Sequence, residues 1–118
     1  MKENIILDKS YKFAVNSLKA VKTLDRSLEN YILVRQLIRA ATSIGANVEE
    51  SQGGQSRKDF IHKLSISFKE AKEVKYWIRL ILDTQVKNDQ AKEVFNNLFN
   101  DADELCRIIF VIMKSSKS

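Results

Sequence analysis

The chain has 118 residues and a formal net charge of +5, with 44% hydrophobic and 30% charged side chains, no proline, three glycines and one cysteine. This composition predicts a single globular domain over residues 1–118, and it excludes a proline-rich linker, an internal disulfide and a turn-rich β-sandwich or barrel. No apolar run approaches the roughly 20 residues of a membrane span and the N-terminus is too polar for a signal peptide, so we expect a cytoplasmic protein.

Apolar residues recur with the period of a helix in the first half of the chain. They predict a first helix over about 9–24, capped by Asp8. Its inner side is expected to carry Tyr11, Phe13, Ala14, Leu18, Val21 and Leu24. A break at about 25–30 precedes a second helix over about 31–52. Gly45 lies inside that helix, where glycine costs about 1 kcal/mol relative to alanine, which predicts a close packing contact.

The same period continues in the second half of the chain. The Gly53-Gly54 pair predicts a left-handed end to the second helix. Ser56, with Asp59 three residues later, resembles a capping box and begins a third helix that runs to about residue 85. Asn88 or Asp89 caps a last helix over about 90–114. Four helices joined by short breaks predict an all-α, up-and-down antiparallel four-helix bundle.

The third predicted helix carries apolar residues on two sides. Ile66, Trp77 and Leu80 lie within about 60° of one another on the helical wheel, opposite its inward stripe. An aligned tryptophan with two aliphatic side chains favours a contact with a second copy of the chain, and scattered exposed apolar residues are the alternative. In the last helix, an apolar run over 108–113 places Phe110 at the edge of the inner face and Val111 on the polar side. This run either covers the end of the bundle or joins a contact between subunits.

Basic residues fill one arc of the first helix and one arc of the third. Clustered basic side chains on helices are typical of proteins that bind the phosphate backbone of nucleic acids, without sequence specificity and with strong dependence on salt. The residues that would contact phosphates are Lys12, Lys19, Lys22, Arg26, Lys69, Lys72 and Arg79. The alternative is that these lysines only make the outer surface of the bundle soluble, as lysines commonly do. We also expect no aromatic residues among these lysines to stack with bases.

Residue types that support catalysis or metal binding are scarce in this chain. His62 follows Asp59 at D-x-x-H spacing, but a metal centre in a bundle needs further histidines and inward glutamates. We therefore expect a capping aspartate and a surface histidine. Cys106 falls on the apolar side of the last helix, as a small core residue does. Because no motif supports a nucleophile, we expect no metal, no cofactor and no enzymatic activity.

The middle of the chain carries an extended motif. It consists of QLIRAATSIGANVEE at 36–50, GGQSRKDF at 53–60 and KEAKEVKYWI at 69–78. The motif resembles the bacterial four-helix bundle family first noticed in open reading frames of 23S rRNA intervening sequences, and the resemblance extends over about residues 8–113. More distantly, the chain resembles the accessory protein of diversity-generating retroelements.

The resemblance implies a four-helix bundle that assembles as a ring-like homo-oligomer, in particular a homopentamer. Arg39, Asn47 and Glu50 fill the family's motif positions, with a role in helix packing, subunit contact or ligand binding. The retroelement protein is basic and is thought to engage nucleic acid and a reverse transcriptase. Charge and resemblance together favour a non-enzymatic homo-oligomer whose basic faces bind RNA or DNA. The alternative is an oligomeric interaction module with a protein partner and no nucleic acid.

Overall fold

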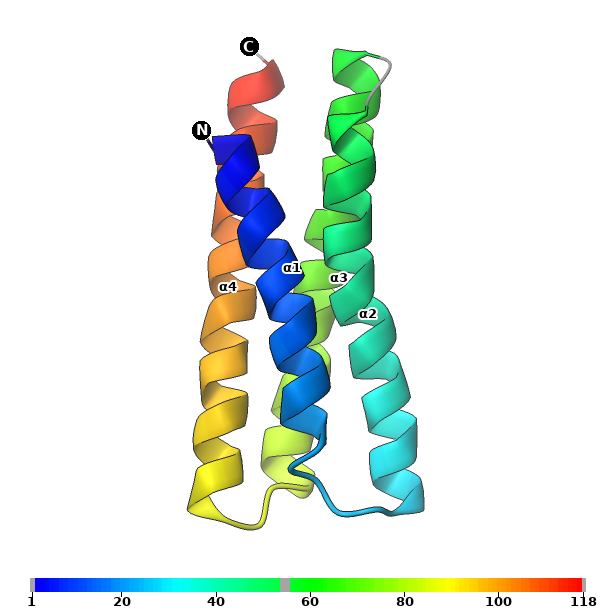
Figure 1. Ribbon diagram of the computed structural model, residues 1–118, viewed down its shortest axis with the longest axis vertical. Coiled ribbons are helices and arrows are strands. Elements are labelled where there is room, and N and C mark those ends of the chain that lie inside the picture. Colours follow the sequence, from blue (N-terminus) through cyan, green and yellow to red (C-terminus); the bar gives the residue numbers. More distant parts are fainter. Residues whose placement is uncertain (1, 54–55, 118) are drawn as a thin grey trace.

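The computed structural model describes residues 2–53 and 56–117, with the side chains of 5–53 and 56–116. It contains four helices, α1 (Lys2–Val21), α2 (Leu28–Gln52), α3 (Arg57–Thr84) and α4 (Asp89–Lys117). Successive helices run in opposite directions along a bundle of 46 × 22 × 18 Å, and the two chain termini lie at the same end of its long axis (Figure 1). Each helix packs against its chain neighbours, and α4 also packs against α1, so α1 and α3 occupy opposite corners. The predicted all-α bundle of four helices is confirmed, and no strand occurs in the described ranges.

Several predicted helix ends differ from the structure. The first helix begins at residue 2, because Ile6 is fully buried and extends the inner face upstream. Asp8 therefore lies inside α1, where it pairs with Lys12 at 3.0 Å, and the prediction that it is the N-cap is wrong. At the end of α2, Gly53 has a φ of −91°, so the predicted left-handed conformation is also wrong there. Gly54 lies outside the described residues.

The other three helices each begin after a residue whose side chain caps the helix. Ser27 caps α2, Ser56 caps α3 and Asn88 caps α4, each by accepting a hydrogen bond from the backbone amide three residues later, at 3.0, 3.1 and 2.8 Å. These oxygens satisfy amides that have no partner inside the helix. The cap at Ser56 is confirmed, and Asn88 is the cap of α4. Ser27 starts α2 three residues before the predicted position.

The core draws apolar side chains from all four helices. The largest fully buried side chains are Phe13, Phe95, Ile6, Leu37, Ile44, Leu64, Ile78, Ile81, Leu98, Leu105, Ile109 and Val48. In α1, Ser10 and Ser17 are also fully buried, and their hydroxyls donate to backbone carbonyls of the preceding turn. Tyr11 and Leu18, which were expected to face inward, are 63% and 47% exposed. The inner side of α1 is therefore rotated toward its serines relative to the prediction.

Small residues bring neighbouring helices close together at the centre of the bundle. A Cβ atom at Gly45 would lie 3.3 Å from the backbone oxygen of Ser10, so the close contact predicted for this glycine is confirmed and involves α1. On the other side of α2, the Ser67 hydroxyl of α3 donates to the Ile44 carbonyl at 2.8 Å. These contacts fix the positions of α1 and α3 along α2.

Candidate nucleic-acid interface

The basic residues predicted to contact phosphates are all exposed, and they form two separate groups. The α1 group, which includes the following turn, consists of Lys12, Lys19, Lys22 and Arg26. The α3 group consists of Lys69, Lys72 and Arg79. Because α1 and α3 occupy opposite corners of the bundle (Figure 1), the two groups lie on helices that do not contact each other. One chain therefore offers two basic surfaces rather than one continuous patch.

The α1 group lies beside carboxylates. Lys12 pairs with the aspartate one turn earlier at 3.0 Å, and Lys9 pairs with Glu104 of α4 at 3.2 Å. Asp101 of α4 lines the same shallow hollow as Lys19. Burial, and then the charge of Glu104, raises the pKa of Asp101, while Lys9 acts in the opposite direction. The positive charge of α1 is therefore partly offset along the side that faces α4.

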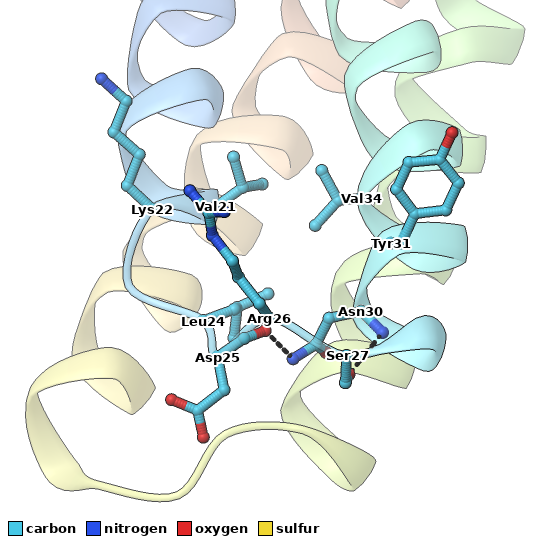
Figure 2. A pocket seen from close by; sticks show the side chains of 9 residues that line it. All are labelled: Val21, Lys22, Leu24, Asp25, Arg26, Ser27, Asn30, Tyr31 and Val34. Carbon is cyan, nitrogen blue, oxygen red and sulfur yellow. Dashed lines mark hydrogen bonds between the residues drawn. The ribbon is translucent and has the colours of Figure 1, made fainter.

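An open hollow of 860 Å³ lies between the end of α1 and the start of α2 (Figure 2). It is lined by Val21, Lys22, Leu24, Asp25, Arg26, Ser27, Asn30, Tyr31 and Val34. The Arg26 side chain extends toward Val21, whereas Asp25 points away (Figure 2). The side-chain amide of Asn30 donates to the backbone carbonyl of Asp25 at 2.6 Å and holds the turn in place. The hollow thus joins apolar walls to the cations Lys22 and Arg26, two of the predicted phosphate contacts.

Aromatic rings lie among the basic residues on the side where α3 faces α4. The ring centroids of Phe68 in α3 and Phe110 in α4 are 6.1 Å apart. Lys72 Nζ lies 5.5 Å from the Phe68 centroid, and Lys114 Nζ lies 5.9 Å from the Phe110 centroid. The expectation that no aromatic residue interleaves with the lysines is therefore wrong. Phe68 precedes Lys72 by one turn, a signal that the sequence offered, whereas Phe110 comes from the neighbouring helix.

Asp103 of α4 is an acidic residue on this side, and two cations hold it. Lys75 of α3 donates to it at 2.9 Å, and Arg107 pairs with its other carboxylate oxygen. The hydrogen bond from Lys75, followed by the nearby charges of Lys75 and Arg107, lowers the pKa of Asp103. The carboxylate is therefore ionised at neutral pH, and it offsets only part of the positive charge here.

The residues predicted to contact a second copy are partly buried within their own chain. Trp77 packs against the core, and its indole Nε1 is buried without a hydrogen-bond partner among the described residues. Tyr76 meets the Trp77 ring edge-on, with centroids 5.0 Å apart, and is 52% exposed. Ile66 and Leu80 are also partly buried. These side chains expose less apolar surface than the helical wheel predicted, and their contact with a second copy stays a prediction.

The three motif positions lie on α2. Arg39 pairs with two glutamates of α3, Glu70 at 3.3 Å and Glu73. Glu50 pairs with a lysine of α3 at 3.0 Å. The Asn47 amide donates to a backbone carbonyl inside α2 at 2.9 Å. For Arg39 and Glu50, these contacts favour helix packing among the roles that the sequence left open.

The histidine and the cysteine occupy different environments. His62 is exposed on α3, whereas Cys106 is buried in α4. Burial raises the pKa of the Cys106 thiol, which therefore stays protonated at neutral pH. Across the described residues, no three histidine, cysteine, aspartate or glutamate side chains are placed to hold a metal ion. Over the same part of the chain, every helix is too short or too polar to cross a membrane.

Comparison with known proteins identifies the family of this bundle. The sequence model of the 23S rRNA-intervening sequence proteins matches residues 2–111. A protein of unknown function from the S23 ribosomal protein family of Bacteroides thetaiotaomicron has a similar crystal structure, with 38% sequence identity and a TM-score of 0.86. The similarity covers 97% of this chain and 99% of that one. No curated protein is detectably similar to the chain. This protein therefore belongs to the family of 23S rRNA-intervening sequence proteins.

Proposed function

We propose that this protein is a non-enzymatic homo-oligomer that binds RNA or DNA through its basic faces, without sequence specificity. The α1 group and the α3 group would bind phosphates. The observation that carries the proposal is that all seven of these cations are exposed on a chain with a net charge of +5. Exposed lysine and arginine side chains on helices bind the nucleic-acid backbone by releasing its condensed counterions.

Self-assembly would multiply the basic surface. The family resemblance implies a ring of five chains, which would carry five times the charge of one chain and would contact one strand at several points. A ring needs two different surfaces on each chain. The Ile66, Trp77 and Leu80 side of α3 supplies one candidate. The exposed apolar residues of α1 and α2 supply the other: Tyr11, Leu18, Leu28, Tyr31 and Ile32.

Fluorescence anisotropy with two unrelated labelled oligonucleotides tests the binding. We expect similar dissociation constants for both sequences at low salt, and a steep loss of affinity as the salt concentration rises. The absence of detectable binding at low salt would contradict the proposal. A large preference for one of the two sequences would contradict the stated lack of specificity.

A further inference from the structure

The side of the bundle between α3 and α4 combines positive charge with aromatic rings. We call it the aromatic–basic face. Its α3 residues are Phe68, Lys72, Lys75 and Arg79, and its α4 residues are Arg107, Phe110 and Lys114. Their spacings, i, i+4, i+7, i+11 on α3 and i, i+3, i+7 on α4, keep each set on one side of its helix. The ring contact of Phe68 with Phe110 and the ion pair of Lys75 with Asp103 bring the two sets together.

Phe110 is a large aromatic residue of this face that lies half outside the core. Its side chain is 51% exposed, although it lies on the same helix as a well-buried core stripe. On α4, Arg107 lies about one turn before it and Lys114 about one turn after it. The aromatic–basic face holds five cations, and Asp103 offsets only one of them. Proteins that bind single-stranded nucleic acid stack bases on exposed aromatic rings beside basic side chains, and Phe110 with its neighbouring cations has these two features.

We propose that the aromatic–basic face binds single-stranded nucleic acid, with a base stacked on Phe110 and the adjoining phosphates bound by Lys72, Arg107 and Lys114. This inference rests on the proposed function and adds the type of strand and the residue that selects it. Every base has a flat face that stacks on an aromatic side chain, so such binding tolerates different sequences. In a duplex both faces of each base are covered by neighbouring bases, and the ring would gain no contact there.

The dimensions of the face suit an extended strand. Lys72 and Arg79 are seven residues apart on α3, and Arg107 and Lys114 are seven residues apart on α4. Each pair therefore spans about 10 Å along the bundle. Lys114 Nζ lies over the Phe110 ring, 5.9 Å from its centroid. A base that stacks on the ring would displace this ammonium, and the flexible lysine side chain would let it reach the adjoining phosphate. A strand can thus run along the aromatic–basic face with cations on both sides.

The test compares four labelled probes of about 12 nucleotides, within the length that one single-strand site covers. They are oligothymidine, oligouridine, an abasic DNA strand and a DNA duplex, each titrated by anisotropy at low salt. Phe110→Leu should weaken binding of oligothymidine and oligouridine about 5- to 150-fold, and should change binding of the abasic strand and the duplex less than about twofold. Tyr76→Leu is the matched control, because Tyr76 is 52% exposed but its ring packs edge-on against Trp77 and takes no part in the Phe68–Phe110 contact. It should leave all four probes within about twofold.

Phe110→Trp keeps an aromatic ring and should retain binding of the single strands, which separates a stacking role from a packing role. Equal affinity of the wild-type protein for oligothymidine and the abasic strand would overturn this inference and leave the proposed function standing. A failure of all four probes to bind would overturn both. If Phe110→Leu changes the mass of the free protein in light scattering, the ring belongs to a subunit contact and this inference is overturned.

Discussion

The two basic groups should contribute unequally to nucleic-acid binding. One variant replaces the α3 group with glutamine (Lys69→Gln, Lys72→Gln and Arg79→Gln), and the other replaces the α1 group in the same way (Lys12→Gln, Lys19→Gln, Lys22→Gln and Arg26→Gln). Glutamine removes the charge and has a similar helix propensity. If exposure alone decided the outcome, the second variant would lose more affinity, because it removes one more cation.

The neighbouring carboxylates predict the opposite order. Each phosphate contact with a single strand contributes about 0.7 to the slope of log K against log salt, so loss of the α3 group should reduce the slope by about 2. In the α1 group, Lys12 already pairs with Asp8, and Asp101 and Glu104 lie along the side of α1 that faces α4. A lysine that already pairs with a carboxylate neutralises a phosphate less completely, so its binding releases fewer counterions from the nucleic acid. We therefore expect a smaller reduction for the α1 variant than for the α3 variant.

The assay is an anisotropy titration of one labelled single strand at four salt concentrations, for the wild-type protein and both variants. Circular dichroism checks that the helices are retained. A reduction of the slope by the α1 variant that equals or exceeds that of the α3 variant would refute the reasoning from neighbouring charges. It would mean that the neighbouring carboxylates do not weaken the contribution of the α1 cations to binding.

Three further changes test the packing and the assembly. Gly45→Leu should lower the free energy of unfolding by about 1–3 kcal/mol in urea, since its side chain would press on the α1 backbone although leucine is the better helix former. Exposed Ala46→Leu should stay within about 0.5 kcal/mol, and a stabilised Gly45→Leu would contradict the close contact. Leu80→Asp should reduce the mass in light scattering with its helical circular dichroism intact, and an unchanged mass would mean that the subunit contact lies elsewhere. Asp103→Asn should destabilise the protein at neutral pH. Because the folded-state pKa of Asp103 is lowered, the stability that its ionised form contributes is lost as the pH falls through that pKa, so the difference in stability between the variant and the wild type should shrink as the pH is lowered. A difference that stays constant or grows as the pH falls would contradict this sign.

Helical periodicity located the inner side of the first helix only in part, because Phe13 is buried as predicted whereas Tyr11 and Leu18 are exposed. In α2, α3 and α4 the core faces are marked by large side chains such as Leu37, Ile78 and Ile109, all fully buried. In α1, Ser10 and Ser17 occupy core positions, where their hydroxyls are satisfied by the backbone of their own helix. A hydropathy pattern assigns serines to the surface. The predicted inner face of α1 was therefore rotated away from Ser10 and Ser17.

The contacts between helices at the candidate site could not be predicted from the sequence of one helix at a time. The exposure of the basic residues followed from their place on each wheel. The contact of Phe68 with Phe110 and that of Lys75 with Asp103 depend on how far α3 and α4 are shifted along each other, which core packing across the bundle decides. Trp77 was placed outside because the wheel has only an inner and an outer side, whereas a bundle helix also has flanks that touch its neighbours.

One measurement tests the central proposal, a homo-oligomer that binds nucleic acid, most directly. The protein is purified at low salt, mixed with a single-stranded oligonucleotide, and passed through a sizing column with light-scattering and dual-wavelength absorbance detection. We expect one peak whose mass corresponds to several chains, with oligonucleotide bound at low salt and released at high salt. A peak with the mass of one chain that elutes apart from the oligonucleotide at low salt would contradict both the assembly and the binding.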